Sequence, residues 1–199
     1  MYGRTVAAVS LACALLGSNL PAQAQYLNDP DGRYSHGQTG RRYEFLGGMS
    51  YAGSIRRETV TAPGKYAPGT IIVNTSERRL YLIQDNGTAL KYGIGVGRVG
   101  FTWAGTTRVV AKKEWPDWTP PSQMLRRRPD LPRFMKGGPD NPLGARAMYL
   151  GASLYRIHGS NEPETIGQAV SSGCFRLMND DVIDLYSRVR IGATVVVLR

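Results

Sequence analysis

From Thr70 to Val96 the sequence is a succession of short apolar, β-branched runs separated by turn residues. Such runs, rich in isoleucine, valine, leucine and tyrosine, are typical of β-strands. The predicted strands here are Thr70–Asn74, Leu80–Ile83 and Leu90–Val96. Thr75–Arg78 and Asp85–Gly87 supply the turns between them. The pattern predicts a three-stranded antiparallel meander at the start of the folded domain.

Further short runs continue this pattern to the end of the chain, at Thr106–Ala111, Ala147–Leu150, Leu154–Ile157 and Thr194–Leu198. Helical signals are fewer. Pro163 suits the first turn of a short helix through Gln168. Asn179 or Asp180 can cap a longer one, whose apolar positions recur at helical spacing from Val182 to Val189. We expect a mainly β domain, a mixed β-sandwich or barrel-like fold with one or two short helices near its C-terminal end.

The segment 115–142 is rich in proline and far longer than a connection between strands needs to be. Loops of this length in compact domains are often functional. We therefore expect it to line or cover a site.

The first 24 residues have the features of a secretory signal peptide. Arg4 supplies a positive start, an apolar run follows from Val6 to Gly17, and Ala22 and Ala24 provide the small residues that a signal peptidase needs. The run is too short to span a bilayer comfortably, and Cys13 lies in a poor context for lipidation. We predict cleavage after Ala24, no integral membrane span after cleavage, and a periplasmic or cell-envelope location.

Residues 25–67 are rich in glycine, tyrosine, arginine, serine and proline and show no sustained period of strand or helix. This composition predicts a flexible linker between the signal peptide and a folded domain at 68–199.

Removal of residues 1–24 leaves one cysteine, Cys174, because Cys13 is lost. An exported protein normally pairs its cysteines, so an unpaired one is either intermolecular or a reactive thiol. The chain has two histidines, and His36 falls in the predicted linker, so the predicted domain holds only His158. Two ligands are too few for a metal site, and the nearby acids are accounted for by helix starts.

The formal charge of the chain is +10, and it becomes +9 without Arg4, since residues 1–24 contain no acidic side chain. Nucleic acid is not the expected partner of an exported protein. An anionic wall polymer or membrane surface suits the compartment better, and simple colloidal solubility explains the charge equally well.

The chemistry of the domain concentrates in two segments, Tyr155–Ser160 and Ser171–Leu177. His158 ends an apolar strand pattern, and Cys174 follows Gly173, where the backbone can approach a substrate closely. A nucleophilic sulfur needs a base or a positive charge nearby, which His158 and Arg176 can supply. Backbone N–H groups at Gly173 and Cys174 can face a developing oxyanion. On the residues alone, the pair can also be interpreted as a buried structural cysteine and a core histidine.

These two segments resemble the active-site signature of the L,D-transpeptidase family, whose catalytic domain is called YkuD. The shared pattern is His158-Gly159, then Ser171-Ser172-Gly173-Cys174, an apolar residue, Arg176 and another apolar residue. An acid follows in the family, here Asp180 or Asp181. The opening strands and the turn at 141–144 are similar too, so the resemblance covers 68–199. Two departures are a serine at 172, where many members have histidine, and Thr102-Trp103 in place of Thr-Pro.

The resemblance implies a two-step acyl transfer without a cofactor. Cys174 would attack the carbonyl of the third residue of a peptidoglycan tetrapeptide stem, releasing the terminal D-alanine and forming a thioester. An amine acceptor, either a second stem or an outer-membrane protein or lipoprotein, would resolve the thioester, with His158 as base. A backbone carbonyl at Gly159 or Ser160 would orient His158. Ser171 and Ser172 would serve the cysteine loop or the substrate.

Arg176 is open to two interpretations of similar weight, a structural ion pair or a substrate contact. Three rival functions also remain. A sortase-like transpeptidase would need its arginine on a strand other than that of the cysteine, a non-catalytic wall-binding protein would have no need of both Cys174 and His158, and an L,D-carboxypeptidase would resolve the same thioester with water.

Overall fold

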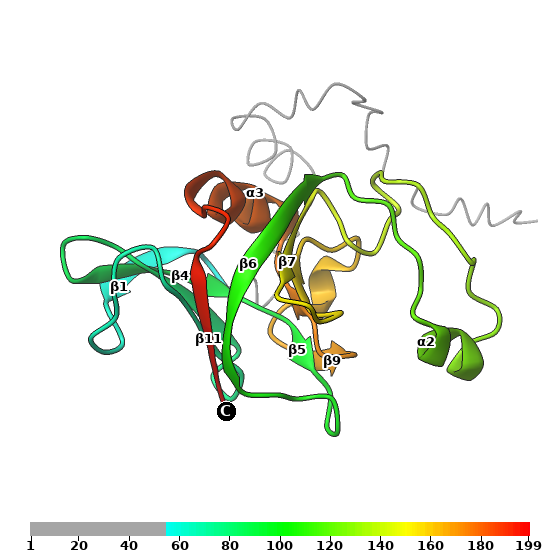
Figure 1. Cartoon of the computed structure of the whole chain (residues 1–199), viewed down its shortest axis with the longest axis horizontal. Helices are drawn as coiled ribbons and strands as arrows, with labels where there is room; N and C mark the ends of the chain where they lie inside the picture. The colour runs from blue at the N-terminus through cyan, green and yellow to red at the C-terminus, as the bar shows by residue number, and fades with distance from the viewer. Residues whose placement is uncertain (1–54) are drawn as a thin grey trace, which may run out of the picture.

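The computed structural model describes residues 55–199, and within them strands predominate over helices (Figure 1). The strands are β1 (Glu58–Thr61), β2 (Ile71–Asn74), β3 (Arg79–Ile83), β4 (Thr88–Gly93), β5 (Val96–Gly97), β6 (Gly105–Glu114), β7 (Arg146–Leu150), β8 (Arg156–His158), β9 (Ala169–Ser171), β10 (Phe175–Arg176) and β11 (Thr194–Leu198). The helices are α2 (Ser122–Arg127), the 3₁₀ turn η1 (Pro163–Thr165) and α3 (Asn179–Arg188). The mainly β prediction is confirmed.

Nine of these strands form one sheet in the order β1-β4-β3-β2-β11-β6-β7-β8-β10, and β5 pairs with β9 separately. Strand β6 serves both halves of the large sheet, because its first residues pair with β11 and its later residues pair with β7. The register shifts between Val109 and Ala111, and such a bulge bends a strand. The sheet is not closed as a barrel, although an isolated bridge joins Arg176 of β10 to Gly95, which lies between β4 and β5.

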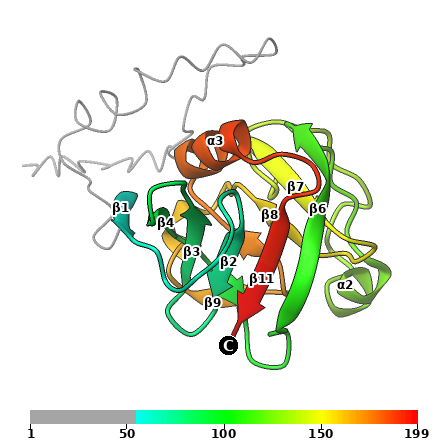
Figure 2. The ribbon, with the colours of Figure 1, turned by 60° about the vertical axis from the view of Figure 1, so that its left-hand side comes forward.

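The core lies between the two halves of this sheet and α3 (Figure 2). It combines side chains of the meander, of β7, β8 and β10, and of α3, including Ile71, Tyr92, Met148, Ile157, Phe175, Val182 and Leu185. The Tyr92 hydroxyl donates a hydrogen bond of 2.7 Å to Asp184 on α3, which satisfies its one polar atom. Burial of these apolar surfaces supplies the main driving force that holds the strands of the site in place.

The predicted meander is present as β2, β3 and β4, which pair in antiparallel register. Gly87 takes a φ of 73° in the turn between β3 and β4, a conformation that favours glycine. The runs predicted at 106–111, 147–150, 154–157 and 194–198 correspond to β6, β7, β8 and β11.

The structure adds a strand inside the range predicted as a linker. Residues 58–61 form β1 and pair with β4 from Glu58 opposite Lys91 to Thr61 opposite Thr88. Lys91 also forms an ion pair with Glu58. The linker prediction therefore needs correction at its C-terminal end, since edge pairing orders a segment whose composition carries no strand period. The predicted signal peptide and linker residues up to 54 lie outside the described residues.

Helix α3 begins at Asn179, whereas the sequence analysis expected Asn179 or Asp180 to cap it. Met178 occupies the cap position without a side-chain hydrogen bond. The Asn179 side chain instead accepts a hydrogen bond of 2.9 Å from the backbone N–H of Ala145. At the other end of α3, Lys112 Nζ on β6 donates to the carbonyls of Tyr186 and Val189 at 2.6 and 2.7 Å. The helix is thus fastened to β6 and to the loop before β7.

The segment 115–142 makes a long excursion that carries α2 away from the sheet (Figure 1). A β-bridge joins Trp118 to Met135 and closes the base of this excursion. Among residues 55–199, no helix is long and apolar enough to cross a membrane.

Candidate active site

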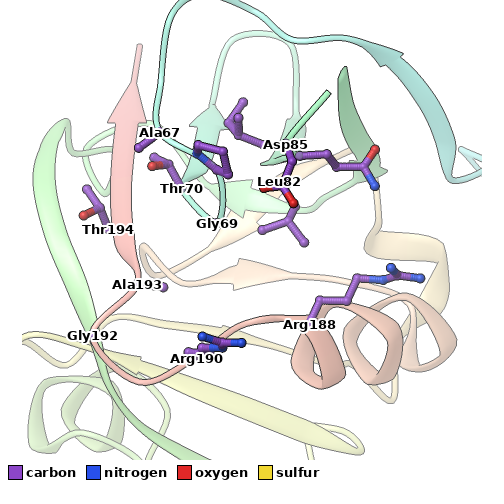
Figure 3. Close-up of a pocket in the computed structure, with 13 residues that line it drawn as sticks. Ala67, Gly69, Thr70, Leu82, Asp85, Arg188, Arg190, Gly192, Ala193 and Thr194 are labelled. Atoms are coloured by element: carbon purple, nitrogen blue, oxygen red, sulfur yellow. The ribbon is translucent and has the colours of Figure 1, made fainter. Parts of the chain in front are cut away.

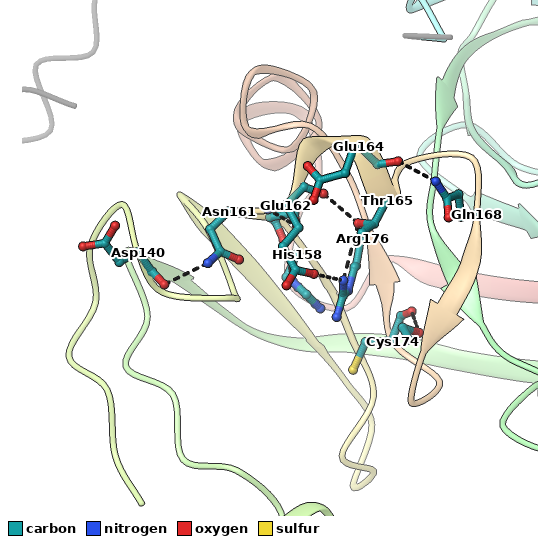
Figure 4. A network of polar contacts seen from close by, with 12 residues as sticks. Asp140, His158, Asn161, Glu162, Glu164, Thr165, Gln168, Cys174 and Arg176 are labelled. Carbon is teal, nitrogen blue, oxygen red and sulfur yellow. Dashed lines mark hydrogen bonds and ion pairs between the residues drawn. The ribbon is translucent and has the colours of Figure 1, made fainter. Parts of the chain in front are cut away.

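Cys174 and His158 lie at the ends of two short strands that pair with each other. Strand β10 runs parallel to β8, with Phe175 opposite Ile157 and Arg176 opposite His158. Cys174 directly precedes β10, and His158 is the last residue of β8. Figure 4 shows the side chains of His158, Arg176 and Cys174 gathered at this edge of the sheet.

His158 is buried, with 4% of its surface exposed, and its Nδ1 lies 2.6 Å from the carbonyl oxygen of Gly159. A carbonyl oxygen only accepts hydrogen bonds, so this contact assigns the proton to Nδ1 and leaves the lone pair on Nε2. Burial, followed by the charge of Arg176, lowers the pKa of His158 to about 3. The imidazole is therefore neutral near pH 7.

The turn that carries Cys174 is fixed by its own hydrogen bonds. Ser171 Oγ donates to the carbonyl of Cys174 at 2.7 Å and accepts from the N–H of Gly173 at 3.1 Å. Ser171 thus contacts the cysteine loop. Because the Gly173 N–H is already bonded, the expectation that it faces an oxyanion does not fit this arrangement.

Aromatic side chains pack against the same turn. Gly173 has a φ of 107°, and a Cβ there would lie 2.5 Å from the Tyr155 ring, so both the backbone and the packing favour glycine. Trp103 stacks on Tyr155 with ring centroids 4.8 Å apart and donates from Nε1 to the Gly173 carbonyl at 3.1 Å. The departure from the family pattern at Trp103 therefore supplies a contact to the nucleophile turn.

Arg176 makes the ion pair that one of its two interpretations required. Its Nη1 lies 2.7 Å from Glu162 Oε2 and 3.4 Å from Thr165 Oγ1 (Figure 4). The arginine side chain is 20% exposed, and its Nε is buried without a hydrogen-bond partner. Its charge is therefore partly compensated by a neighbouring carboxylate.

Ser172 is linked to helix α2 of segment 115–142 through Arg98 and Phe101. Arg98 Nη1 lies 3.4 Å from Ser172 Oγ, and the Arg98 guanidinium lies 4.2 Å from the centroid of Phe101. Arg127 of α2 lies 5.3 Å from the same ring centroid. These contacts place part of segment 115–142 near the turn that carries Cys174.

Arg156, which the sequence did not single out, also lies beside the thiol. Its Nη1 donates to the carbonyl of Leu154 at 3.0 Å, and Cys174 Sγ lies 3.8 Å from the same oxygen. Burial raises the pKa of the Cys174 thiol, while hydrogen bonds and charge from Arg156, and then Arg176, act to lower it. Burial prevails, so the resting pair is a thiol and a neutral imidazole. One sequence signal was available: Arg156 lies two positions before His158 on a strand, and side chains two positions apart in a strand point to the same face.

The acid that the resemblance expected after the cysteine lies on α3. Asp180 is exposed, and Asp181 lies 3.5 Å from Arg57. Burial raises the pKa of Asp181 to about 6. Neither residue makes a recorded contact with Cys174 or His158. Within residues 55–199, no cluster of three or more histidine, cysteine or acidic side chains is placed to hold a metal.

A cavity of about 630 Å³ lies elsewhere, between the turn before β2, the end of β3 and the segment from α3 to β11 (Figure 3). Arg188 and Arg190 line one side and Asp85 the other. Arg188 is paired with Asp184 at 3.0 Å. None of the residues of the cysteine and histidine site lines this cavity.

An unpaired thiol and a buried histidine thus lie at the ends of two paired strands of a mainly β domain. The sequence matches the model of the L,D-transpeptidase catalytic domain family, YkuD, over residues 68–197. The chain belongs to this family. The match decides against the sortase-like rival.

Curated relatives agree with this assignment. A probable L,D-transpeptidase ErfK/SrfK of Escherichia coli (strain K12) is 42% identical over 137 residues, which are 64% of this chain and 43% of the relative. The chain thus covers less than half the length of the curated relatives of this kind that it matches.

Solved structures show the same fold. L,D-transpeptidase 3 from Mycobacterium tuberculosis aligns with a TM-score of 0.54 at 18% identity, over 65% of this chain and 60% of that one. A structure from Brucella melitensis, named as a probable carnitine operon oxidoreductase caia, is 46% identical with a TM-score of 0.50, over 73% of this chain and 95% of that one. That name belongs to the other protein, and the family match rests on this chain's own residues.

Proposed function

We propose that this protein is an L,D-transpeptidase that acts on peptidoglycan stem peptides through a thioester on Cys174. The proposal is supported by the parallel pairing of β8 and β10, because β8 ends on His158, β10 begins directly after Cys174, and the Nδ1 of His158 faces the Gly159 carbonyl. The family match supports the same reaction class.

In the first step the thiol proton of Cys174 moves to Nε2 of His158. The thiolate attacks the carbonyl carbon of the third stem residue, and the carbonyl electrons move to oxygen. The N–H of Cys174, for which the described residues provide no acceptor, is available to that oxyanion. Collapse of the intermediate breaks the amide bond, and the imidazolium returns its proton to the departing amine of D-alanine.

In the second step an acceptor amine attacks the thioester and gives its proton to His158 as the thiolate leaves. The thiolate then regains the proton from the imidazolium, and the enzyme returns to its resting form. Because the first product must depart before the acceptor reacts, the kinetic order should be ping-pong.

The acceptor and the location extend the proposal. A second stem would give a 3–3 crosslink, and an outer-membrane protein or lipoprotein would give protein anchoring. Both acceptors require export to the periplasm, which the signal peptide predicted at 1–24 would provide. Intact mass of the exported protein should show Gln25 as its first residue, and retention of Met1 would contradict this part.

The test offers a disaccharide-tetrapeptide and a disaccharide-pentapeptide separately and measures released D-alanine. We expect stoichiometric release from the tetrapeptide and a product joined to the acceptor amine. Consumption of the pentapeptide alone would contradict the L,D assignment. Conversion of the tetrapeptide to a free tripeptide, with no joined product at saturating amine, would assign an L,D-carboxypeptidase instead. No release from either stem by the folded protein would favour the wall-binding alternative.

A further inference from the structure

Because Cys174 and His158 are both uncharged at rest, the reaction needs something that stabilises the Cys174 thiolate. A thiolate at Cys174 is anionic in a half-buried site, and burial without compensation disfavours it. The neutral imidazole offers no opposing charge before it takes the proton. A fixed positive charge near the sulfur would meet the requirement, and the two arginines that face the thiol are Arg156 and Arg176.

These two arginines differ in whether a neighbouring carboxylate offsets their charge. Arg176 is paired with Glu162 at 2.7 Å, so a carboxylate already offsets its charge. Within residues 55–199, Arg156 has no carboxylate at ion-pair distance and contacts only neutral groups. Its Nη1 donates to the Leu154 carbonyl, and its guanidinium lies 5.1 Å from the centroid of the Tyr149 ring.

The Leu154 carbonyl ties Arg156 to the nucleophile. Arg156 Nη1 and Cys174 Sγ approach the same oxygen, at 3.0 and 3.8 Å. Parallel pairing of β8 and β10 brings Arg156 alongside the residue before Phe175, which is Cys174. The guanidinium also keeps a buried Nε without any hydrogen-bond partner, and such a donor is costly unless it serves another group.

We propose that Arg156 is a positioning residue that stabilises negative charge on the sulfur of Cys174. The inference rests on the proposed function and adds a residue to its machinery. When the thiol proton passes to Nε2 of His158, the sulfur loses its donor contact with the Leu154 carbonyl, because a thiolate and a carbonyl oxygen are both acceptors. The guanidinium can donate to both and so holds the anion beside the oxygen.

The test measures the rate at which iodoacetamide alkylates Cys174 in the full-length protein as a function of pH, with the site followed by peptide mass spectrometry. Arg156→Met keeps an apolar stem against Tyr149 and removes the charge. An opposite charge within about 4–6 Å shifts a pKa by about 1–3 units. We therefore expect the midpoint of the alkylation profile to rise by at least about one pH unit, and the rate at pH 7 to fall about tenfold.

Two further variants make the result specific. Arg156→Lys keeps the charge and should restore most of the profile. Arg108→Met removes another guanidinium that donates to a backbone carbonyl, that of Gly192 at 2.9 Å, and should leave the profile unchanged. If Arg156→Met does not fold, as judged by circular dichroism, Arg156→Gln serves as the neutral variant.

An unchanged midpoint in a folded neutral variant would overturn the inference, and so would a slower rate at every pH without a shift. Alkylation requires no stem peptide, so its outcome is independent of D-alanine release. Failure of Arg156 to shift the profile while tetrapeptide is still consumed would reject this inference and leave the transpeptidase proposal standing.

Discussion

Gly159 is the residue at which a single added methyl group should disturb both the fold and the site. It follows His158, and its carbonyl fixes the histidine ring. A Cβ built at Gly159 would overlap Asn179 Oδ1 and would lie 3.0 Å from Ala145 N and 3.2 Å from Gly144 Cα. The backbone of Gly159 is not among the left-handed positions, so the effect of Gly159→Ala is steric alone.

The magnitude follows from what must move. Asn179 Oδ1 accepts the hydrogen bond of the Ala145 N–H, and Ala145 is only 1% exposed. Displacing Asn179 leaves this buried donor unsatisfied, at a cost of about 1–3 kcal/mol. Fitting the extra methyl into a packed interior costs about 1–3 kcal/mol more. We expect Gly159→Ala to lower the free energy of unfolding by about 2–6 kcal/mol, and to slow the reaction because the Gly159 carbonyl shifts.

The assay is urea unfolding of Gly159→Ala, Asn179→Ala and the double variant. Asn179→Ala removes the overlapping oxygen and already leaves Ala145 unpaired. Both single variants therefore lose the same hydrogen bond, and the double variant can lose it only once. Its loss in free energy of unfolding should be at least about 1 kcal/mol smaller than the sum of the two single losses. A Gly159→Ala protein within about 0.5 kcal/mol of wild type, or strictly additive losses, would refute this reasoning.

Three other predictions follow from the site and its supports. Replacing His158 with alanine should slow thioester formation by about 10²–10⁴-fold in a folded protein, and near-normal turnover would assign the base elsewhere. Lys112→Met should lower the free energy of unfolding by about 1–3 kcal/mol in urea, since two carbonyls at the end of α3 lose a charged donor; no change would show that the contact is not stabilising. Acid should destabilise the fold through His158, because the pKa of its imidazole is about 3 in the folded protein and about 6.5 in the unfolded chain. As the pH falls below about 6.5, the unfolded chain binds a proton that the folded protein does not bind, and the free energy of unfolding decreases. Asp181, with a pKa raised to about 6, acts in the opposite sense over part of this range. His158→Gln should therefore reduce the loss of stability between pH 7 and pH 4 by about 3 kcal/mol, Asp181→Asn should increase it, and parallel pH curves for all three proteins would contradict both assignments.

Local patterns of the sequence were enough to predict the strands of the meander, β6, β7, β8, β11 and helix α3. Each of these is a run of several residues whose period or composition is visible on its own. Strand β1 was not predicted, because its order comes from pairing with β4 and its surroundings resemble a linker. Strand β10 has two residues and exists through its parallel pairing with β8, which no local pattern shows.

The site shows the same division between local and tertiary information. Cys174 and His158 stood out because the predicted domain has one of each. The partner of Asn179 was misjudged, because a polar residue at a helix start reads as a cap, whereas here its oxygen accepts from Ala145 across the fold. Arg156 was missed because its importance arises from the carbonyl that it shares with Cys174 Sγ.

We propose above that Cys174 forms a thioester with the third residue of a tetrapeptide stem. Rapid-quench intact-mass spectrometry, with tetrapeptide and no acceptor amine, tests it most directly. We expect an adduct with the mass of the stem lacking D-alanine, located on Cys174 by peptide mapping and absent from Cys174→Ala. An adduct on another residue, or equal labelling of Cys174→Ala, would contradict the proposed thioester, as would tetrapeptide turnover by the Cys174→Ala protein.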